Sequence, residues 1–382
     1  MPKQADSKTS VPRSEPAPAG RLRKRLNPTL GKARNMLRDA LRDAGLEPRG
    51  TASSPPPLLL VACSGGPDSL ALAEAASFFA RRGDYRVGAV VVDHGLQAGS
   101  AEVAAEAAAK LGRMGLEPVQ VRTVSVPASG MGPEAAARTV RYAALDAAVE
   151  ETGAHAVLLG HTLDDQAEQV LLGLARGSGT RSLAGMRPVR GAYLRPLLGL
   201  RRSETEEICE SLGLDPWHDP SNTDPAFARS RVRAEVLPFL EEKLGPGIAE
   251  ALFRSSRILA NDADYLDAVS AETFARLRTA PAAAENASAA EGDTILLPEE
   301  PLRELAPAVR QRVLALAAVE LGGAQPSYER LRSVEALLRR TGSAGPVELV
   351  GKVSVYRQVR GQPVPQGPSG YGNLVFRKKS ST

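Results

Sequence analysis

The stretch that decides the fold is LLLVACSGGPDS, residues 58–69. An apolar run ends at Ser64, two glycines and a proline follow, and an Ala- and Leu-rich run continues through Ala80. This order predicts a strand, a tight turn and a helix. The glycines let the backbone turn sharply, and Pro67 suits a first helical turn because its missing N–H would be unpaired there. The free N–H groups and the helix dipole of such a turn favour a phosphate ligand.

The loop is not a Walker A motif, because the pattern Gly-x4-Gly-Lys-Ser/Thr is absent and no lysine reaches a terminal phosphate. Residues 64–69, SGGPDS, instead resemble the pyrophosphate loop of the N-type ATP pyrophosphatases. Those enzymes split ATP into AMP and pyrophosphate while they activate a carbonyl oxygen. The alternative is an ordinary glycine turn in which Asp68 and Ser69 serve only the helix dipole. Six matching residues directly after an apolar strand favour the pyrophosphate loop.

Length, charge and cysteine content narrow the class of protein. A chain of 382 residues predicts two domains, or one domain with appendages. The net charge of +4 permits a nucleic-acid partner without requiring one. Cys63 and Cys209 lie far apart and no Cys-x-x-Cys exists, which argues against a zinc ribbon, an iron–sulfur site or a disulfide framework. Because no apolar run is long enough to span a bilayer or to serve as a signal peptide, we expect a cytoplasmic protein.

Strand and helix patterns alternate over residues 58–176. The predicted strands lie at 58–63, 86–92, 119–126 and 155–160, and the predicted helices at 68–82, 100–114, 133–150 and 162–176. Continuous apolar strands between helices are typical of a doubly wound parallel α/β sheet. A ligand of such a sheet lies beyond the carboxyl ends of the strands.

Polar residues follow two of these elements. Asp93, at the tip of the second predicted strand, is placed to hold a magnesium ion or a ribose hydroxyl, and a turn-forming aspartate is the alternative. Glu134, Arg138 and Arg141 share one face of the third predicted helix because they are four and three residues apart. A solvated stripe of ion pairs is the alternative interpretation of that face.

The richest polar stretch, HTLDDQAEQ at 161–169, comes directly after the fourth predicted strand. Helical spacing can bring His161, Asp165 and Glu168 onto one face. Five polar groups at a predicted crevice indicate metal and amine recognition. An acid that serves only the helix dipole is the alternative for Asp164, and a structural role is the alternative for His161 alone.

A last candidate region spans residues 217–233. Trp217, the only tryptophan of the chain, stands in a turn-rich loop, and Arg229, Arg231 and Arg233 follow it. Arginines near an aromatic ring suit phosphate contacts and base stacking. A surface loop with a half-buried tryptophan is the alternative.

Together the motifs resemble those of the tRNA(Ile)-lysidine synthase family over residues 58–240. They are Ser64–Ser69, Asp93-His94-Gly95, Glu134–Tyr142, His161–Glu168, Met186-Arg187-Pro188 and Trp217–Arg233. The first identifies only the superfamily, whereas HTLDDQAE followed by DPSN is far more specific. Three residues depart from the family pattern: Gln169 replaces the usual threonine, His218 a frequent acid and Ser230 a common asparagine.

The resemblance implies a fold and a reaction. The implied fold is α/β, a doubly wound parallel sheet of the adenine nucleotide alpha hydrolase-like (PP-loop) type, followed by a mainly helical tRNA-binding region and a short β-rich C-terminal segment. The implied ligase takes ATP, Mg2+, L-lysine and tRNA(Ile) with a CAU anticodon. It adenylates the C2 oxygen of the wobble cytidine, and the lysine amine then displaces AMP to form lysidine, which changes decoding from AUG to AUA. No membrane partner is expected, and a homodimer is compatible with the resemblance.

The resemblance also implies parts and site residues. The expected parts are a PP-loop catalytic domain at 28–240, a helical substrate- and tRNA-binding domain at 241–345 and a β-rich segment at 346–382. Composition, rather than the resemblance, predicts a disordered basic tail at 1–27 and a mobile insertion at 280–293. ATP binding is expected from Ser64, Gly65, Gly66, Pro67, Asp68, Ser69 and Asp93, with Asp68 also a metal ligand. Catalysis is expected from Arg141, His161 and Asp165, lysine binding from Asp165 and Glu168, and tRNA binding from Arg229, Arg231 and Arg233. Whether an acid or His161 takes the proton of the lysine amine stays open.

Three other functions are alternatives. Another PP-loop ATP pyrophosphatase, such as a tRNA thiolase, would need cysteine chemistry for which Cys63 and Cys209 are a poor substitute. A GMP- or NAD-synthetase-like amidotransferase is disfavoured because no glutaminase part is apparent. A non-catalytic RNA-binding protein on a degenerate nucleotide fold is disfavoured by the intact stretches 64–69 and 161–168.

Overall fold

The computed structural model describes most of the chain. The described residues are 27–48, 55–95, 99–127, 133–220, 224–278, 294–339, 342–358 and 372–379. They belong to two compact units, of which the first holds Met1–Thr162 and Pro188–Asp219 and the second Leu163–Arg187 and Pro220–Thr382. The predicted tail before residue 27 and the predicted insertion at 280–293 lie outside the described residues. The division at residue 240 between a catalytic domain and a tRNA-binding domain stays a prediction.

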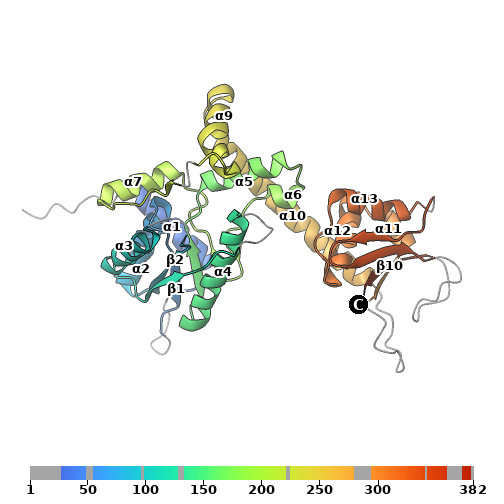
Figure 1. Ribbon diagram of the computed structural model, residues 1–382, viewed down its shortest axis with the longest axis horizontal. Coiled ribbons are helices and arrows are strands. Elements are labelled where there is room, and N and C mark those ends of the chain that lie inside the picture. The colour runs from blue at the N-terminus through green and yellow to red at the C-terminus, as the bar shows by residue number, and fades with distance from the viewer. Residues whose placement is uncertain are drawn as a thin grey trace, which may run out of the picture. The chain divides into compact units, whose positions relative to one another are not determined.

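A six-stranded sheet forms the centre of the first unit (Figure 1). Its strands, in spatial order, are β3 (Val119–Thr123), β2 (Arg86–Asp93), β1 (Leu58–Ala62), β4 (Ala156–Leu159), β6 (Tyr193–Leu194) and β5 (Val189–Arg190). The first five are parallel, and β5 is antiparallel to β6. The strand order reverses between β1 and β4, which confirms the predicted doubly wound sheet. The strands β5 and β6 were not predicted, because two residues show no periodicity.

Helices cover both faces of this sheet. They are α1 (Pro28–Asp43), α2 (Pro67–Arg82), α3 (Ser100–Arg113), α4 (Pro133–Thr152) and α7 (Arg202–Leu212). Leu59 and Val61 pack against α1, α2, α3 and α7, whereas Leu58 and Leu60 pack on the opposite face with residues of α4. Burial on both faces explains why β1 is a continuous apolar run rather than an alternating one.

The second unit is mainly helical. Its helices are α5 (Leu163–Ala175), α6 (Thr180–Leu183), α8 (Ala228–Arg231), the π-helical turn η2 (Val232–Val236), α9 (Leu237–Leu244), α10 (Ile248–Leu277), α11 (Glu299–Glu304), α12 (Pro307–Glu320) and α13 (Tyr328–Leu337). The long helix α10 packs against α5, α6 and α12. None of the helices in the described part of the chain is long and apolar enough to cross a membrane.

The second unit also contains a four-stranded antiparallel sheet. Its order is β7 (Thr294–Pro298), β10 (Asn373–Lys378), β9 (Val353–Arg357) and β8 (Val347–Leu349). The last three strands confirm the β-rich segment expected near the C-terminus, whereas β7 was not predicted. Leu297 of β7 and Phe376 of β10 are fully buried together with Leu314 of α12. The edge strand β7 thus completes a core that the three C-terminal strands do not close alone.

Candidate active site

The PP-loop is the turn that joins β1 to α2, at the carboxyl edge of the parallel sheet. Gly65 has φ +82°, and a Cβ atom there would lie 3.4 Å from the Cβ of Ala107. A Cβ atom on Gly160, directly after β4, would lie 3.0 Å from the carbonyl oxygen of Asp68. Gly65 is required by its left-handed conformation, whereas Gly160 is required by the close approach that lets the start of α2 lie against the end of β4.

Hydrogen bonds inside the loop hold its shape. The Ser69 hydroxyl donates to the carbonyl oxygen of Gly66 at 2.9 Å and accepts from the backbone N–H of Ser64 at 3.3 Å. The sulfur of Cys63 lies 3.3 Å from the same hydroxyl, and burial raises the pKa of the Cys63 thiol. Ser69 is buried and serves the loop itself, whereas the Ser64 side chain is exposed. Of the two serines, Ser64 is therefore the one with its side chain accessible to a nucleotide.

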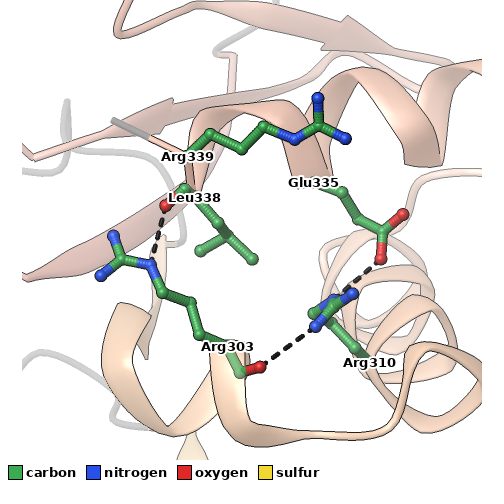
Figure 2. Close-up of a pocket in the computed structure, with 5 residues that line it drawn as sticks. All are labelled: Arg303, Arg310, Glu335, Leu338 and Arg339. Atoms are coloured by element: carbon green, nitrogen blue, oxygen red, sulfur yellow. Dashed lines mark hydrogen bonds and ion pairs between the residues drawn. The ribbon is translucent and has the colours of Figure 1, made fainter. Parts of the chain in front are cut away.

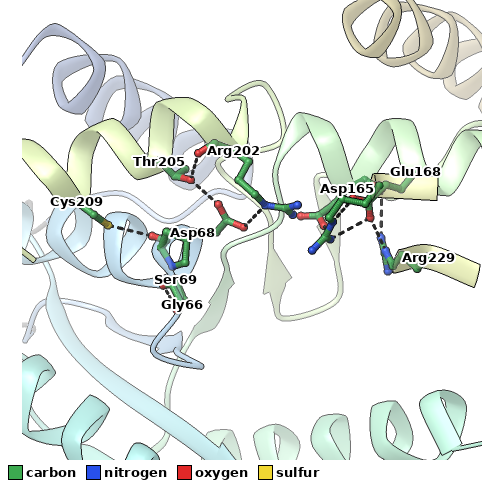
Figure 3. A network of polar contacts seen from close by, with 11 residues as sticks. Gly66, Asp68, Ser69, Asp165, Glu168, Arg202, Thr205, Cys209 and Arg229 are labelled. Carbon is green, nitrogen blue, oxygen red and sulfur yellow. Dashed lines mark hydrogen bonds and ion pairs between the residues drawn. The ribbon is translucent and has the colours of Figure 1, made fainter. Parts of the chain in front are cut away.

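The Asp68 carboxylate, in the first turn of α2, is oriented by α7 (Figure 3). The hydroxyl of Thr205 donates a short hydrogen bond to Oδ1, and Nε of Arg202 lies 3.3 Å from Oδ2. Thr205 is fully buried, and its hydroxyl also lies 2.7 Å from the carbonyl oxygen of Arg202. The carboxylate therefore has a fixed direction, although a fifth of its side-chain surface stays exposed. Neither α7 residue was predicted to belong to the site.

The loop after α7 is hydrogen-bonded to the PP-loop. The backbone N–H of Trp217 donates to the carbonyl oxygen of Gly65 at 2.9 Å. The ammonium group of Lys110, from α3, donates a short hydrogen bond to the carbonyl oxygen of Asp215. The same lysine lies near enough to Cys63 for its charge to lower the pKa of that thiol, against the larger effect of burial. The predicted aromatic loop thus lies against the nucleotide loop.

Asp93, His94 and Arg141 gather at the neighbouring end of β2. The carboxylate of Asp93 accepts from the N–H of Gly95 at 2.9 Å, the contact of a turn-forming aspartate. Burial lowers the pKa of His94, the positive charge of Arg141 lowers it further, and Asp93 and Asp219 oppose the shift. Arg141 also lowers the pKa of Cys63. Since Cys63 follows β1 and His94 follows β2, the α4 guanidinium lies near the carboxyl ends of both strands.

Within the first unit, the predicted residues therefore share one edge of the sheet. The PP-loop follows β1, Asp93 ends β2, and His161 comes two residues after β4, next to β1. The Nδ1 atom of His94 is buried and has no hydrogen-bond partner among the residues that the structure describes. A buried polar atom without a partner at this edge marks His94 as a further candidate for substrate contact.

The second unit holds the remaining predicted residues, and four of them, Asp165, Glu168, Arg229 and Arg233, form one ion-pair cluster (Figure 3). Glu168 is completely buried, and its carboxylate accepts from Nε of Arg229 at 2.8 Å and from Nε of Arg233 at 2.7 Å. Arg233 also lies 3.4 Å from a carboxylate oxygen of Asp165. Arg231 stands apart, because its guanidinium donates to the carbonyl oxygens of Pro225 and Ala226. Residues predicted for lysine and for tRNA are thus paired with each other.

Comparison with known proteins identifies the family. A family model described as the PP-loop domain matches residues 45–240, and one described as the TilS substrate binding domain matches residues 297–360. The tRNA(Ile)-lysidine synthase of Leifsonia xyli is 50% identical over 305 residues, which cover 80% of this chain and 89% of that protein. The chain belongs to the tRNA(Ile)-lysidine synthase family. The tRNA(Ile)-lysidine synthase of Streptomyces coelicolor is 48% identical over 79% of this chain and 83% of that protein.

The family match confirms the resemblance seen in the motifs. The PP-loop match also confirms the fold class. Among solved structures, the U34-tRNA thiolase NcsA of Methanococcus maripaludis is similar over 61% of this chain and 80% of that chain, at 19% identity and a TM-score of 0.49. A likeness of that degree decides nothing about the chemistry of a member of the lysidine synthase family.

Several site residues of this family member were not predicted. Thr205 and Arg202 contact a side chain more than 130 positions earlier in the sequence, and no periodicity reveals such a pair. Gln166, within the polar stretch 161–169, holds a loop of its own unit, because its amide oxygen accepts from the N–H of Met186 at 2.8 Å. The sequence did offer an indication of His94, because Asp93-His94-Gly95 places a titratable side chain directly after the end of a strand.

Proposed function

We propose that the chain ligates L-lysine to C2 of the wobble cytidine in the CAU anticodon of tRNA(Ile), with ATP as the energy source. The product would be lysidine, which switches decoding from AUG to AUA. Membership of the tRNA(Ile)-lysidine synthase family, over nearly the full length of its relatives, carries this proposal. The oriented Asp68 carboxylate in the PP-loop supports it, because ATP activation is the step that such a loop serves.

In the first proposed step, the C2 oxygen of cytidine attacks the α-phosphorus of ATP. A C–O–P bond forms, and the bond to the leaving pyrophosphate breaks. We assign the pyrophosphate to the backbone N–H groups and polar side chains of Ser64, Gly65, Gly66, Pro67, Asp68 and Ser69, with Asp93 as a further ATP contact. The N-terminal end of α2 supports this assignment, since the first N–H groups of a helix and its dipole attract anions.

We propose that a magnesium ion binds together with ATP. Asp68 fits the ion because it offers an oriented carboxylate with exposed surface at the phosphate-binding turn. Mg2+ is commonly held by one or two carboxylates and by substrate phosphates. When bound, it would neutralise charge on the phosphates. Thr205 and Arg202 would keep the carboxylate pointed in one direction.

We assign to Arg141 the stabilisation of the negative charge that develops on the phosphates in this step. Its guanidinium lies near the ends of β1 and β2, where the PP-loop and His94 lie. A fixed cation near the phosphates would stabilise the transition state and the departing AMP. A neutral His94, favoured by its lowered pKa, would be able to accept a hydrogen bond there.

In the second proposed step, the side-chain amine of lysine attacks C2 and AMP leaves with the C2 oxygen. The amine must lose a proton, for which His161 and Asp165 are the proposed groups. We assign the lysine ammonium to Asp165 and Glu168. The two carboxylates differ in access, because the Asp165 side chain keeps 11% of its surface exposed and Glu168 keeps none. Glu168 would act mainly by holding Arg229 and Arg233.

The tRNA is assigned to Arg229, Arg231 and Arg233. Guanidinium groups recognise phosphates with two parallel hydrogen bonds, and such contacts make affinity depend on salt. Arg229 and Arg233 are oriented by a buried carboxylate, which lowers the entropy lost when they bind a phosphate.

Labelled lysine incorporation tests the proposed function. The protein would be incubated with ATP, Mg2+, labelled lysine and tRNA(Ile) bearing CAU, and we expect label in the tRNA. Asp68→Asn should abolish incorporation, while Asp84→Asn, at a half-buried carboxylate that pairs with Arg82 after the carboxyl end of α2, should retain it. Absence of label with wild-type protein, under conditions where ATP and the tRNA both bind, would refute the proposed function.

A further inference from the structure

Three arginines line a hollow in the second unit, apart from the ion-pair cluster of Glu168. The hollow has a volume of about 500 Å³ and is lined by Arg303, Arg310, Glu335, Leu338 and Arg339 (Figure 2). Arg303 comes from α11, Arg310 from α12 and Glu335 from α13, and the other two residues follow α13 directly. Side chains of three helices therefore share one opening.

Two of the arginines are held in place by their neighbours. Nε of Arg303 donates to the carbonyl oxygen of Leu338 at 2.7 Å, and its Nη2 donates to the buried carboxylate of Glu299 at 2.8 Å. Nε of Arg310 donates to Glu335 at 2.8 Å, and its Nη1 donates to the carbonyl oxygen of Arg303 at 3.3 Å. These contacts order two flexible side chains before any ligand arrives, which removes part of the entropic cost of binding.

Positive charge is in excess in the hollow. Its lining holds three guanidinium groups and one carboxylate. That carboxylate, of Glu335, is shared between Arg310 and the amide of Gln311 at 2.9 Å. Even with Glu299 counted against Arg303, one positive charge remains. Arg339 is exposed, and its guanidinium forms no hydrogen bond or ion pair with another residue that the structure describes.

We propose that this hollow binds a phosphate group of the RNA backbone, a phosphodiester, through Arg339 supported by Arg303 and Arg310. Guanidinium groups are suited to phosphate because their planar N–H pairs match two oxygens. Among the described residues that line the hollow, Leu338 is the one apolar side chain and none is aromatic, so they offer no surface on which a base could stack. The contact would position the RNA without reading its sequence. This inference rests on the proposed function, in which tRNA is the substrate.

The test is tRNA binding by Arg339→Gln at several salt concentrations. Each phosphate contact contributes about 0.9 to the slope of log K against log salt concentration. We therefore expect the slope to fall by about 0.9. Taking equal affinities at 1 M salt, a tenfold lower salt concentration makes the variant bind more weakly than the wild type by a factor of ten to the power of about 0.9. At 0.1 M salt the affinity is thus expected to be about eightfold lower. Arg339→Lys should restore most of the slope, and Arg339→Glu should lose more affinity than Arg339→Gln.

Arg330→Gln is the matched control. Arg330 lies on α13 and is exposed, and its side chain forms no hydrogen bond or ion pair with another residue that the structure describes, so the substitution removes the same charge outside the hollow. We expect its slope and affinity to stay near the wild-type values. Equal slopes for wild type, Arg339→Gln and Arg330→Gln would overturn the proposal, as would equal losses in the two variants.

Calorimetric titration with inorganic phosphate separates the two sources of the anion. Loss of phosphate binding in Arg339→Gln together with the reduced slope for tRNA supports a backbone phosphate. Loss of phosphate binding with unchanged tRNA affinity would overturn the RNA assignment and leave a site for a free anion. The proposed function is tested apart from this, because lysine incorporation is measured on the wild type. Wild type that binds tRNA with the expected slope but incorporates no lysine would refute the function and not the hollow.

Discussion

The buried carboxylate of Glu168 gives the most quantitative prediction for stability. Glu168→Gln preserves the size of the side chain but removes its negative charge. Three hydrogen bonds reach the two carboxylate oxygens, from Nε of Arg229 at 2.8 Å and from Nε and Nη2 of Arg233 at 2.7 and 3.2 Å. The glutamine amide has one acceptor oxygen, so at least one of these bonds is lost against its NH2 group and the others lose the negative charge of their acceptor. Two guanidinium groups are left beside a neutral amide.

Two lines of reasoning give the same magnitude. A hydrogen bond to a charged group contributes about 1.5–3 kcal/mol, so the loss of one such bond and the weakening of the other two amount to about 3 kcal/mol. Breaking a buried ion pair costs about 3–5 kcal/mol. The lower end applies, because Arg229 and Arg233 keep 24% and 29% of their side-chain surface exposed and water recovers part of the loss. We therefore expect the free energy of unfolding of the second unit to fall by about 3 kcal/mol.

Thermal unfolding followed by circular dichroism measures this effect. For a unit of this size, about 3 kcal/mol corresponds to a fall in Tm of about 6–12 °C. Glu272→Gln is the matched control, because Glu272 is exposed on α10 of the same unit and the same charge is removed. We expect the control to change the free energy of unfolding by less than about 0.5 kcal/mol.

The outcome also separates two roles of Glu168. A fall in Tm with Glu168→Gln, rescued in part by a second substitution Arg233→Gln, identifies an ion pair that supports the fold. An unchanged Tm with a raised KM for lysine would refute the structural reasoning and would assign the carboxylate to the substrate alone. A Tm equal to the wild type with unchanged kinetics would contradict both roles.

Three further predictions concern the first unit. Thr205→Val removes the hydroxyl that orients the PP-loop carboxylate, so kcat/KM for ATP should fall about tenfold or more while Thr205→Ser retains it, and unchanged ATP kinetics would count against that role. Burial keeps Cys63 protonated at neutral pH and raises the pKa of Cys209 to about 12, so Cys63→Ser with Cys209→Ser should keep lysine incorporation, whereas its loss would favour sulfur chemistry. The lowered pKa of His94 should appear as an NMR titration midpoint below 6.5, and Arg141→Gln should raise that midpoint; a midpoint at or above 6.5 would contradict the account. The pKa of His94 is lower in the folded chain than in the unfolded chain, so the unfolded chain takes up a proton first as the pH falls. The contribution of His94 to the free energy of unfolding is therefore present above pH 6.5 and is lost as the pH falls.

The parallel sheet and its nucleotide loop were predictable because their signals are local. Strand β1 is buried on both faces, so it appears in the sequence as five apolar residues in a row. Gly65 needs its positive φ within the turn itself, and Pro67 marks the first turn of α2. Each of these constraints acts within a few residues, and the order of strand, turn and helix follows from them.

The partners of the charged residues were not predictable, because they depend on long-range packing. Helical spacing placed Asp165 and Glu168 on one face, but it does not show that Arg229 and Arg233 neutralise them. Strand β7 was missed as well, because β10, with which it pairs, lies far along the chain. A strand recognised by its pairing, like an acid recognised by its counter-ion, requires the folded structure.

The most direct test of the central claim is nucleoside analysis of tRNA after reaction with the protein. Isoleucine tRNA and methionine tRNA, both with a CAU anticodon, would be incubated with ATP, Mg2+ and lysine, digested to nucleosides and examined by mass spectrometry. The account predicts lysidine in place of the wobble cytidine of the isoleucine tRNA and unmodified cytidine in the methionine tRNA. A sulfur-containing nucleoside, or unmodified cytidine in both tRNAs despite release of pyrophosphate, would contradict it.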